Sequence, residues 1–177
     1  MKIIIVGAGQ VGRDLAENLI REENDITLID IDTKVLHEIQ NRLDLRTVIG
    51  SGASPEVIRR AGADDTDMII AVTNRDEVNM IAFQIAYSLF KIPKKIARIR
   101  DHTLLSYPQL FKDEAIPIDV SISPEIIITH FIKRLMEHPG ALQVLDFADG
   151  KVQLVSVKPY RHGAMVGKSI AELHAHV

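Results

Sequence analysis

The chain has 177 residues, of which 46% are hydrophobic and 25% charged, and its formal net charge is −3. These values predict one ordinary globular domain, or one domain with part of another, and they exclude a disordered tail. The small negative charge and the 5% aromatic content argue against nucleic acid as a partner, and the absence of cysteine excludes disulfides, thiolate metal sites and a cysteine nucleophile.

The chain opens on a strand-like apolar run at 1–6, without the charged start and cleavage site of a signal peptide. No run of about 18 apolar residues, the length that crosses a membrane, is present. We therefore expect a cytoplasmic protein with no direct membrane insertion.

Short runs rich in β-branched residues alternate with helical stretches over the first 120 residues. The spacings predict helices after the glycine-rich segment at 7–12, after Asp32 or Thr33, from Ser54 to Gly62, and from Asn74 to the residue before Pro93. Several of the runs are apolar on both faces, which is typical of strands in a covered parallel sheet. The alternation predicts a doubly wound (Rossmann) α/β sheet. The expected strands are 3–6, 26–30, 47–49, 68–73, 95–99 and 117–120.

The pattern changes after Ser123. A helix is expected to about His138, followed by strands at 141–148 and 151–157 around an Asp149-Gly150 turn, and by a new helix near Lys168. About 40 residues cannot bury a stable core alone. We expect a nucleotide-binding domain at 1–121, a connecting helix at 122–139, and the opening of a second, small α+β domain at 140–177.

A G-x-G-x-x-G motif follows the first predicted strand and opens an amphipathic helix, which is the context that dinucleotide binding requires. Gly7 allows a tight turn, Gly9 lets the backbone approach a pyrophosphate, and Gly12 lets the helix pack closely. The amides of the helix N-terminus then face the phosphates. The predicted phosphate loop consists of Gly7, Ala8, Gly9, Gln10, Val11 and Gly12.

Asp30 lies 18 residues after Gly12, at the end of the second predicted strand. A carboxylate there can accept hydrogen bonds from both ribose hydroxyls. Asp32 follows closely and no basic residue occurs before Lys34, so a 2′-phosphate would meet two carboxylates. The sequence therefore favours NAD(H), ATP or ADP over NADP.

Other strand ends should meet at the same edge of the sheet, where such folds bind ligands. We expect Ser51 and Gly52 beside an adenine ring, and Thr73 and Asn74 near the pyrophosphate or second ribose, although both are equally explained as helix caps. Arg98, and Arg100 just beyond its strand, can neutralise phosphate.

No catalytic motif is evident. The seven histidines form no H-x-x-x-H pattern, and neither G-x-S-x-G nor a Walker A sequence occurs. A dehydrogenase needs a substrate domain with an acid–base group, and only the short segment after 140 could supply one. The motifs predict a protein that binds a nucleotide but catalyses no reaction.

Several segments together resemble the TrkA family, the cytoplasmic regulatory subunits of Trk-type bacterial potassium uptake. They are IIIVGAGQVGRDLAENL, ENDITLIDID, RTVIGSGASPEVIRRAGADDTDMIIAVT, DEVNMIAFQIAYSLF and KKIARIRD. Such proteins contain RCK (or KTN) domains, each followed by a small ligand domain. The resemblance implies NAD(H) and ATP/ADP as ligands, the membrane K⁺ transporter subunit as partner at the inner face of the cell membrane, and gating control without turnover.

Carried over by position, the resemblance places ligand contacts at Gly7–Gly12, Asp30, Thr73, Asn74 and Arg98. The chain departs from the family pattern at Gly50-Ser51-Gly52, where many members have G-D-A, and at Gln10, where some have arginine. A γ-phosphate contact would then come from elsewhere, such as Arg100. Two alternatives remain: the N-terminal half of an NAD-dependent oxidoreductase, and a regulator of a glutathione-linked antiporter.

The helix expected at 124–137 is apolar on more than one side. Ile128, Phe131, Ile132 and Leu135 follow helical spacing, and Ile127 and Met136 widen the apolar arc. A second copy of the same helix is the simplest partner, so we expect a homo-oligomer, a dimer or larger. The resemblance also implies pairing of this helix. Coverage by the rest of a second domain is the alternative.

Overall fold

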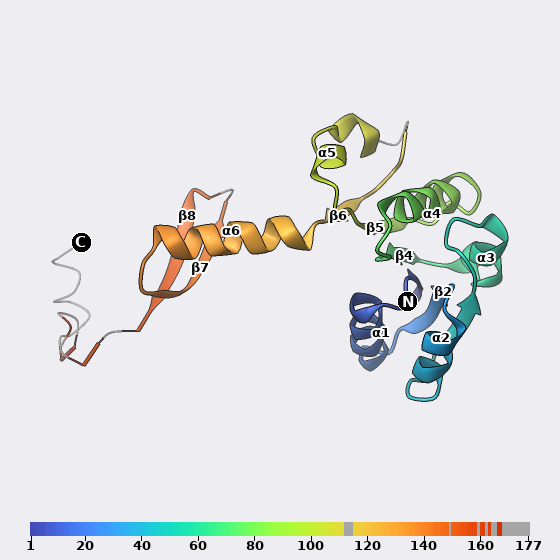
Figure 1. Ribbon diagram of the computed structural model, residues 1–177, viewed down its shortest axis with the longest axis horizontal. Helices are drawn as coiled ribbons and strands as arrows, with labels where there is room; N and C mark the ends of the chain where they lie inside the picture. The colour runs from blue at the N-terminus through green and yellow to red at the C-terminus, as the bar shows by residue number, and fades with distance from the viewer. Residues whose placement is uncertain (112–114, 149, 159, 162, 164–165, 168–177) are drawn as a thin grey trace. The chain divides into compact units, whose positions relative to one another are not determined.

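The structure is a computed structural model that describes residues 1–111, 115–148, 150–158, 160–161, 163 and 166–167 (Figure 1). The chain divides into two compact units, Met1–Pro124 and Glu125–Val177. Asp149 of the expected turn and the expected helix near Lys168 lie outside the described residues. The domain boundaries expected at 121 and 139 stay predictions.

The first unit is built on a six-stranded sheet in which every neighbouring pair is parallel. The strand order β3-β2-β1-β4-β5-β6 confirms the predicted doubly wound fold, with the winding direction reversing between β1 and β4. The strands are β1 (Lys2–Val6), β2 (Asp25–Asp30), β3 (Arg46–Ile49), β4 (Met68–Ala71), β5 (Lys94–Arg98) and β6 (Val120–Ile122).

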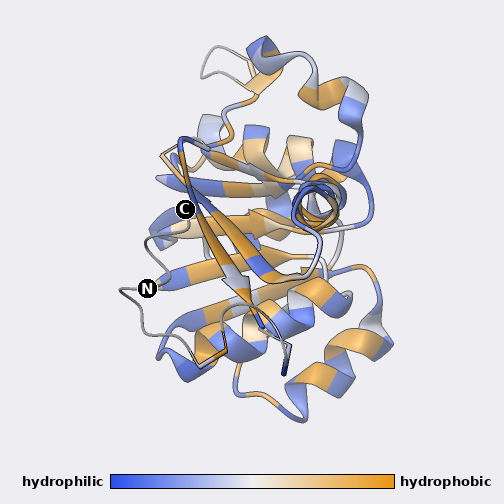
Figure 2. Ribbon diagram, turned by 90° about the vertical axis from the view of Figure 1, so that its left-hand side faces the viewer, coloured by the Kyte–Doolittle hydropathy of each residue, from blue (hydrophilic) through white to orange (hydrophobic). Residues whose placement is uncertain are grey.

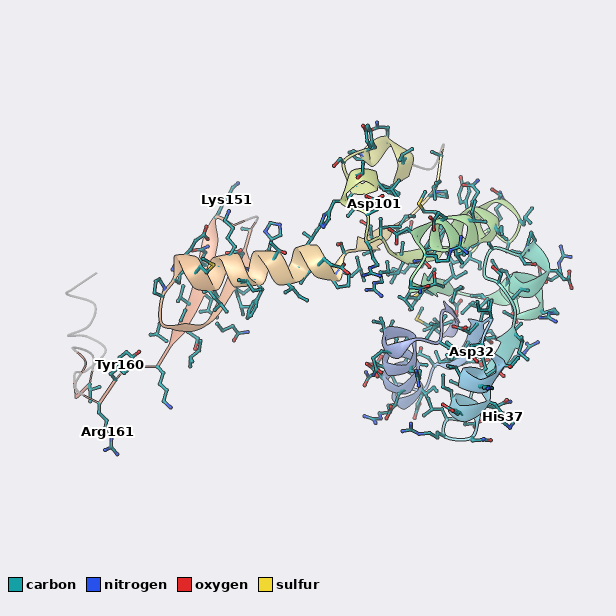
Figure 3. The ribbon with its side chains drawn as sticks, viewed as in Figure 1. Asp32, His37, Asp101, Lys151, Tyr160 and Arg161 are labelled. Atoms are coloured by element: carbon teal, nitrogen blue, oxygen red, sulfur yellow. The ribbon has the colours of Figure 1, made fainter. Side chains whose placement is uncertain are left out.

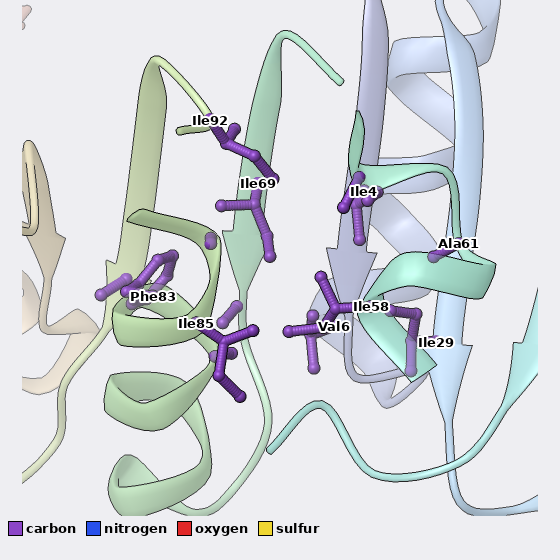
Figure 4. Packing of buried hydrophobic residues seen from close by; sticks show 14 of the residues in the cluster. Ile4, Val6, Ile29, Ile58, Ala61, Ile69, Phe83, Ile85 and Ile92 are labelled. Atoms are coloured by element: carbon purple, nitrogen blue, oxygen red, sulfur yellow. The ribbon is translucent and has the colours of Figure 1, made fainter. Parts of the chain in front are cut away.

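Helices cover both faces of this sheet. Helices α1 (Gln10–Arg21) and α2 (Thr33–Gln40) pack on one face, and α3 (Pro55–Arg60), the 3₁₀ turn η1 (Ala63–Asp65) and α4 (Asp76–Ser88) pack on the other. Strand β1 contributes Ile4 to the cluster under α3 and α4, and Ile3 to the cluster under α1 and α2. Figure 4 shows the first cluster, and Figure 2 shows hydrophobic residues running through the strands. Burial on both faces explains why these strands are apolar throughout.

The segment between β5 and β6 differs from the prediction. The sixth strand was expected at 117–120 but pairs with β5 only from Val120 to Ile122. Pro117 has no N–H for the ladder, and the Asp119 carboxylate accepts the Lys95 amide at 2.6 Å just before the pairing begins. A short helix, α5 (His102–Leu105), capped by Asp101, and the 3₁₀ turn η2 (Pro108–Phe111) occupy a stretch for which the sequence predicted no element.

The second unit contains helix α6 (Pro124–Glu137) from Glu125 onward, and a hairpin of β7 (Ala141–Phe147) and β8 (Val152–Val157). Arg134 of α6 donates to Asp146 of β7 at 2.8 Å, and this bond holds the pKa of Asp146 below its ordinary value. The helix exposes Ile127, Ile128, Phe131, Ile132 and Met136. Within the described ranges, no helix is both long and apolar enough to span a membrane.

Candidate functional site: a cleft at the carboxyl ends of the strands

A cleft of about 730 Å³ opens at the carboxyl ends of β1 to β5, wholly within the first unit. This volume lies in the range of about 300–1,000 Å³ that is usual for small-molecule sites. The position is where a doubly wound sheet binds its ligand, at the reversal of winding. Five segments line it: Val6–Val11 with Arg13, Ile29–Asp32 with Val35, Gly50–Gly52, Val72–Arg75 with Val78, and Arg98.

The glycine loop at 7–12 packs against the start of α1 and the end of β4. Gly7 has φ +106°, and a Cβ there would lie 2.9 Å from the Thr73 nitrogen. A Cβ on Gly12 would lie 1.8 Å from the Gly7 carbonyl oxygen. Gly12 therefore allows the first turn of α1 to close on the loop, whereas a Cβ on Gly9 would meet nothing within 4 Å. The loop is therefore closely packed at Gly7 and Gly12 but open at Gly9, where a ligand has room to approach the backbone.

The N-terminus of α1 supplies donors to this space. The first helical hydrogen bond joins the Arg13 amide to the Gly9 carbonyl at 3.0 Å. The amides of Gln10, Val11 and Gly12 precede it and therefore have no partner within the helix. Together with the positive end of the helix dipole, these donors suit a phosphate group.

Asp30 lies at the end of β2, where its carboxylate joins two backbone segments. Its Oδ2 accepts the Ala8 amide of the glycine loop at 2.6 Å, and its Oδ1 accepts the Asp32 amide at 2.9 Å. Asp30 therefore braces the loop, and each oxygen keeps a lone pair for a further donor such as a ribose hydroxyl. Asp32 caps α2 by accepting the amides of Lys34 and Val35; it is labelled in Figure 3.

Ser51 and Gly52 follow β3 and line the same cleft. Ser51 Oγ accepts the Ala53 amide at 3.2 Å, which tightens the turn into α3. A Cβ on Gly52 would lie 2.2 Å from Val6 Cγ1. The turn after β3 therefore presses against β1 and places this edge of the cleft beside the glycine loop.

Thr73, Asn74 and Arg98 line the opposite part of the cleft. The N-cap of α4 is Arg75, so neither Thr73 nor Asn74 occupies that position. The buried side chain of Asn79 contacts Thr73 and the backbone of Arg98. Asn79 was not predicted from the sequence, although a polar residue amid the apolar positions of a helix is a usable signal.

Arginines give this part of the cleft a positive character. Arg13 and Arg75 line the cleft together with Arg98, and neither Arg13 nor Arg75 was predicted from the sequence. Arg13 stands three residues after Gln10, a spacing that places both at the first turn of α1. Asp30 and Asp32 lie toward β2, and Arg75 and Arg98 lie toward β4 and β5. The cleft is therefore acidic at one end and basic at the other.

Two predicted residues stand outside this lining. Gly12 lies behind the loop that it helps to close, and Arg100 is exposed, with its amide donating to Asp76 Oδ2 at 2.8 Å. Arg100 is not among the described residues that line the cleft, and its role stays a prediction. The structure brings the other predicted residues together at one edge of the sheet.

The family model of the TrkA-N domain matches residues 3–124. The Trk system potassium uptake protein TrkA of Halomonas elongata is 59% identical over 177 residues, covering 100% of this chain and 39% of that protein. The protein of the same name from Vibrio alginolyticus is 51% identical over 178 residues, again with 100% and 39% covered. The chain thus spans 39% of the length of these relatives.

Solved structures share the fold. The TrkA-N domain of the inner membrane protein ybaL from Escherichia coli superposes with a TM-score of 0.66 at 20% identity, covering 76% of this chain and 96% of that one. GsuK bound to ADP gives 0.63 at 25% identity, with 77% and 34% covered. The GsuK channel bound to NAD gives 0.58 at 16% identity, with 70% and 21% covered.

Proposed function

The chain belongs to the TrkA-N domain family, and we propose on that basis that its first unit binds NAD(H) or an adenine nucleotide as the signal of a potassium-transport regulator. One observation carries the proposal. The glycine loop, the unpaired amides of α1 and the Asp30 carboxylate converge on one cleft at the reversal of winding. Phosphate donors and a ribose acceptor at that spacing suit a nucleotide.

The charges of the cleft support a ligand without a 2′-phosphate. Asp30 and Asp32 both line the end at β2, and the described lining has no lysine or arginine from that strand or from α2. A phosphorylated ribose would be repelled there. The arginines toward β4 and β5 favour an anionic group at the other end, as in the phosphates of ADP or ATP.

The proposed activity is binding without turnover. The described residues that line the cleft include no histidine, lysine, tyrosine or cysteine, and the two carboxylates among them, Asp30 and Asp32, already accept backbone amides. The alternative, the N-terminal half of an NAD-dependent oxidoreductase, needs an acid–base group for hydride transfer from elsewhere.

The proposed partner is the membrane K⁺ transporter subunit of a Trk-type system, and the proposed location is the inner face of the cell membrane. The names of the relatives support this assignment. The exposed apolar residues of α6 support assembly as a homo-oligomer.

Isothermal titration calorimetry of nucleotide-free protein tests the proposal. We expect micromolar-range binding of NADH, NAD⁺, ADP or ATP and weaker binding of NADPH. Bound NADH should stay reduced when a panel of carbonyl compounds is added. Absence of binding heat with all four nucleotides would contradict nucleotide sensing, whereas oxidation of NADH by one carbonyl compound would favour the oxidoreductase.

A further inference from the structure

We infer that Asn79 is a positioning residue of the cleft, because its side-chain amide fixes the ends of β4 and β5 to each other. The inference rests on the proposed nucleotide site. Asn79 lies in the first turns of α4, is 0% exposed, and does not itself line the cleft. It acts through Thr73 and Arg98, which do.

The amide of Asn79 uses its whole hydrogen-bonding capacity on these two residues. Its Oδ1 accepts the Thr73 amide at 3.1 Å and the Thr73 hydroxyl at 2.7 Å. Its Nδ2 donates to the Thr73 carbonyl at 3.3 Å and to the Arg98 carbonyl at 2.9 Å. Two acceptor sites and two donor hydrogens are all that an asparagine side chain offers. A buried and fully satisfied polar group of this kind rigidifies its surroundings.

The orientation of the amide follows from its partners. The Thr73 amide can only donate, so it requires the oxygen, and the Arg98 carbonyl can only accept, so it requires the nitrogen. Aspartate would keep the contacts with the Thr73 donors and set an oxygen against the Arg98 carbonyl. The position therefore needs an acceptor on one side and a donor on the other.

Asn79 also sets what Thr73 can offer to a ligand. The hydroxyl has a single proton, and Asn79 Oδ1 at 2.7 Å is a closer acceptor than the Arg75 carbonyl at 3.0 Å. With its proton directed to Asn79, the hydroxyl oxygen accepts the Arg75 amide at 3.2 Å and keeps one lone pair for a ligand. Thr73 thus suits a donor on the ligand, such as a ribose hydroxyl, and leaves anionic groups to the arginines.

The same helix turn holds the chain just beyond β5. Asp76 Oδ2 accepts the amides of Arg100 and Asp101, both at 2.8 Å. Asp76 and Asn79 are three residues apart and therefore neighbours on one side of α4. The first turn of α4 thus ties both strand ends that form the basic part of the cleft.

The test compares Asn79→Asp with Phe83→Leu, a change to a fully buried residue one turn along the same helix that contacts the core. NADH and ADP affinities are measured by calorimetry at a temperature where every variant is folded. We expect Asn79→Asp to weaken binding by about tenfold or more, the effect of about 1.4 kcal/mol. Phe83→Leu should change affinity by less than about twofold despite its loss of stability.

A double-mutant cycle separates positioning from general damage. In an Arg98→Ala background, the cost of Asn79→Asp should shrink by at least about threefold, because the substitution removes the side chain that Asn79 positions through the Arg98 carbonyl. An unchanged cost in both backgrounds would overturn the inference, as would wild-type affinity in Asn79→Asp. Wild-type protein that binds neither NADH nor ADP would instead contradict the proposed function.

Hydrogen exchange on the unaltered protein gives a second measurement if Asn79→Asp does not fold. The Thr73 amide, bonded to the buried Asn79 oxygen, should exchange slowly before and after NADH is added. Exchange as fast as that of an exposed loop amide in the nucleotide-free protein would show that the strand ends are not held in advance.

Discussion

Replacing the Asp30 carboxylate by an amide should separate its bracing of the glycine loop from its contact with the ligand. In Asp30→Asn, an NH2 group replaces one of the two carboxylate oxygens. This group donates hydrogen bonds and can no longer accept a backbone amide. Ala8 is fully buried while Asp32 is exposed, so the remaining oxygen should face Ala8 and the Asp32 amide should turn to water. We therefore expect a loss of about 1 kcal/mol in the free energy of unfolding.

The effect on ligand affinity should be larger, because the charged acceptor for the ribose is lost. Hydrogen bonds to a charged group contribute about 1.5–3 kcal/mol, which corresponds to a loss of about 10- to 150-fold in affinity for NADH. The ratio of the affinities for NADH and NADPH should also be smaller in Asp30→Asn than in the wild type. Calorimetry with both dinucleotides and urea unfolding measure the two effects separately.

Asp101→Asn is the matched control. Asp101 is also an aspartate that accepts a backbone amide at a helix start, that of Thr103 at 2.7 Å, but it lies outside the cleft lining; Figure 3 labels it. It should change stability by less than about 0.5 kcal/mol, because asparagine and aspartate are about equally favourable N-caps, and it should lose no affinity. If Asp30→Asn binds NADH as tightly as wild type, or if wild type binds NADH and NADPH equally, Asp30 does not contact the ribose.

Three further variants test the packing. Gly12→Ala, whose Cβ would meet the Gly7 carbonyl at 1.8 Å, should lower the free energy of unfolding in urea by about 2–4 kcal/mol. Gly9→Ala should leave stability within about 1 kcal/mol but weaken nucleotide binding, and equal stability losses in the two variants would contradict this account of the loop. Phe131→Asp should convert the protein to monomers in sedimentation velocity with nucleotide binding retained. A wild type that is already monomeric at tens of micromolar, or a variant that stays dimeric, would show that α6 is not the contact between two copies.

The sequence predicted those features that periodicity and local motifs encode. The doubly wound sheet follows from strands apolar on both faces, and the loop at 7–12 combines glycine spacing with its position between strand and helix. The placement of β6 failed because the apolar residues around Pro117 suggested a strand, whereas pairing depends on which backbone amides are free to join β5. Helix α5 has only four residues, too few for a periodic signal.

The missed cleft residues depend on contacts between distant segments. Arg13 is an ordinary surface residue of an amphipathic helix until the fold brings α1 beside the cleft. Asn79 interacts with Arg98, 19 positions away, and nothing in the spacing of the two residues indicates that contact. Asp30 was identified as a ribose ligand, but its bond to the Ala8 amide appears only when the loop folds back over β2.

Every residue that lines the cleft, and both apolar clusters beneath it, belong to the unit that ends at Pro124. The information needed to recognise a ligand is therefore contiguous in the gene. A recombination event that joined a different C-terminal sequence after Pro124 would leave the ligand-binding unit intact. Selection could then change what the bound nucleotide controls without altering the residues that select it.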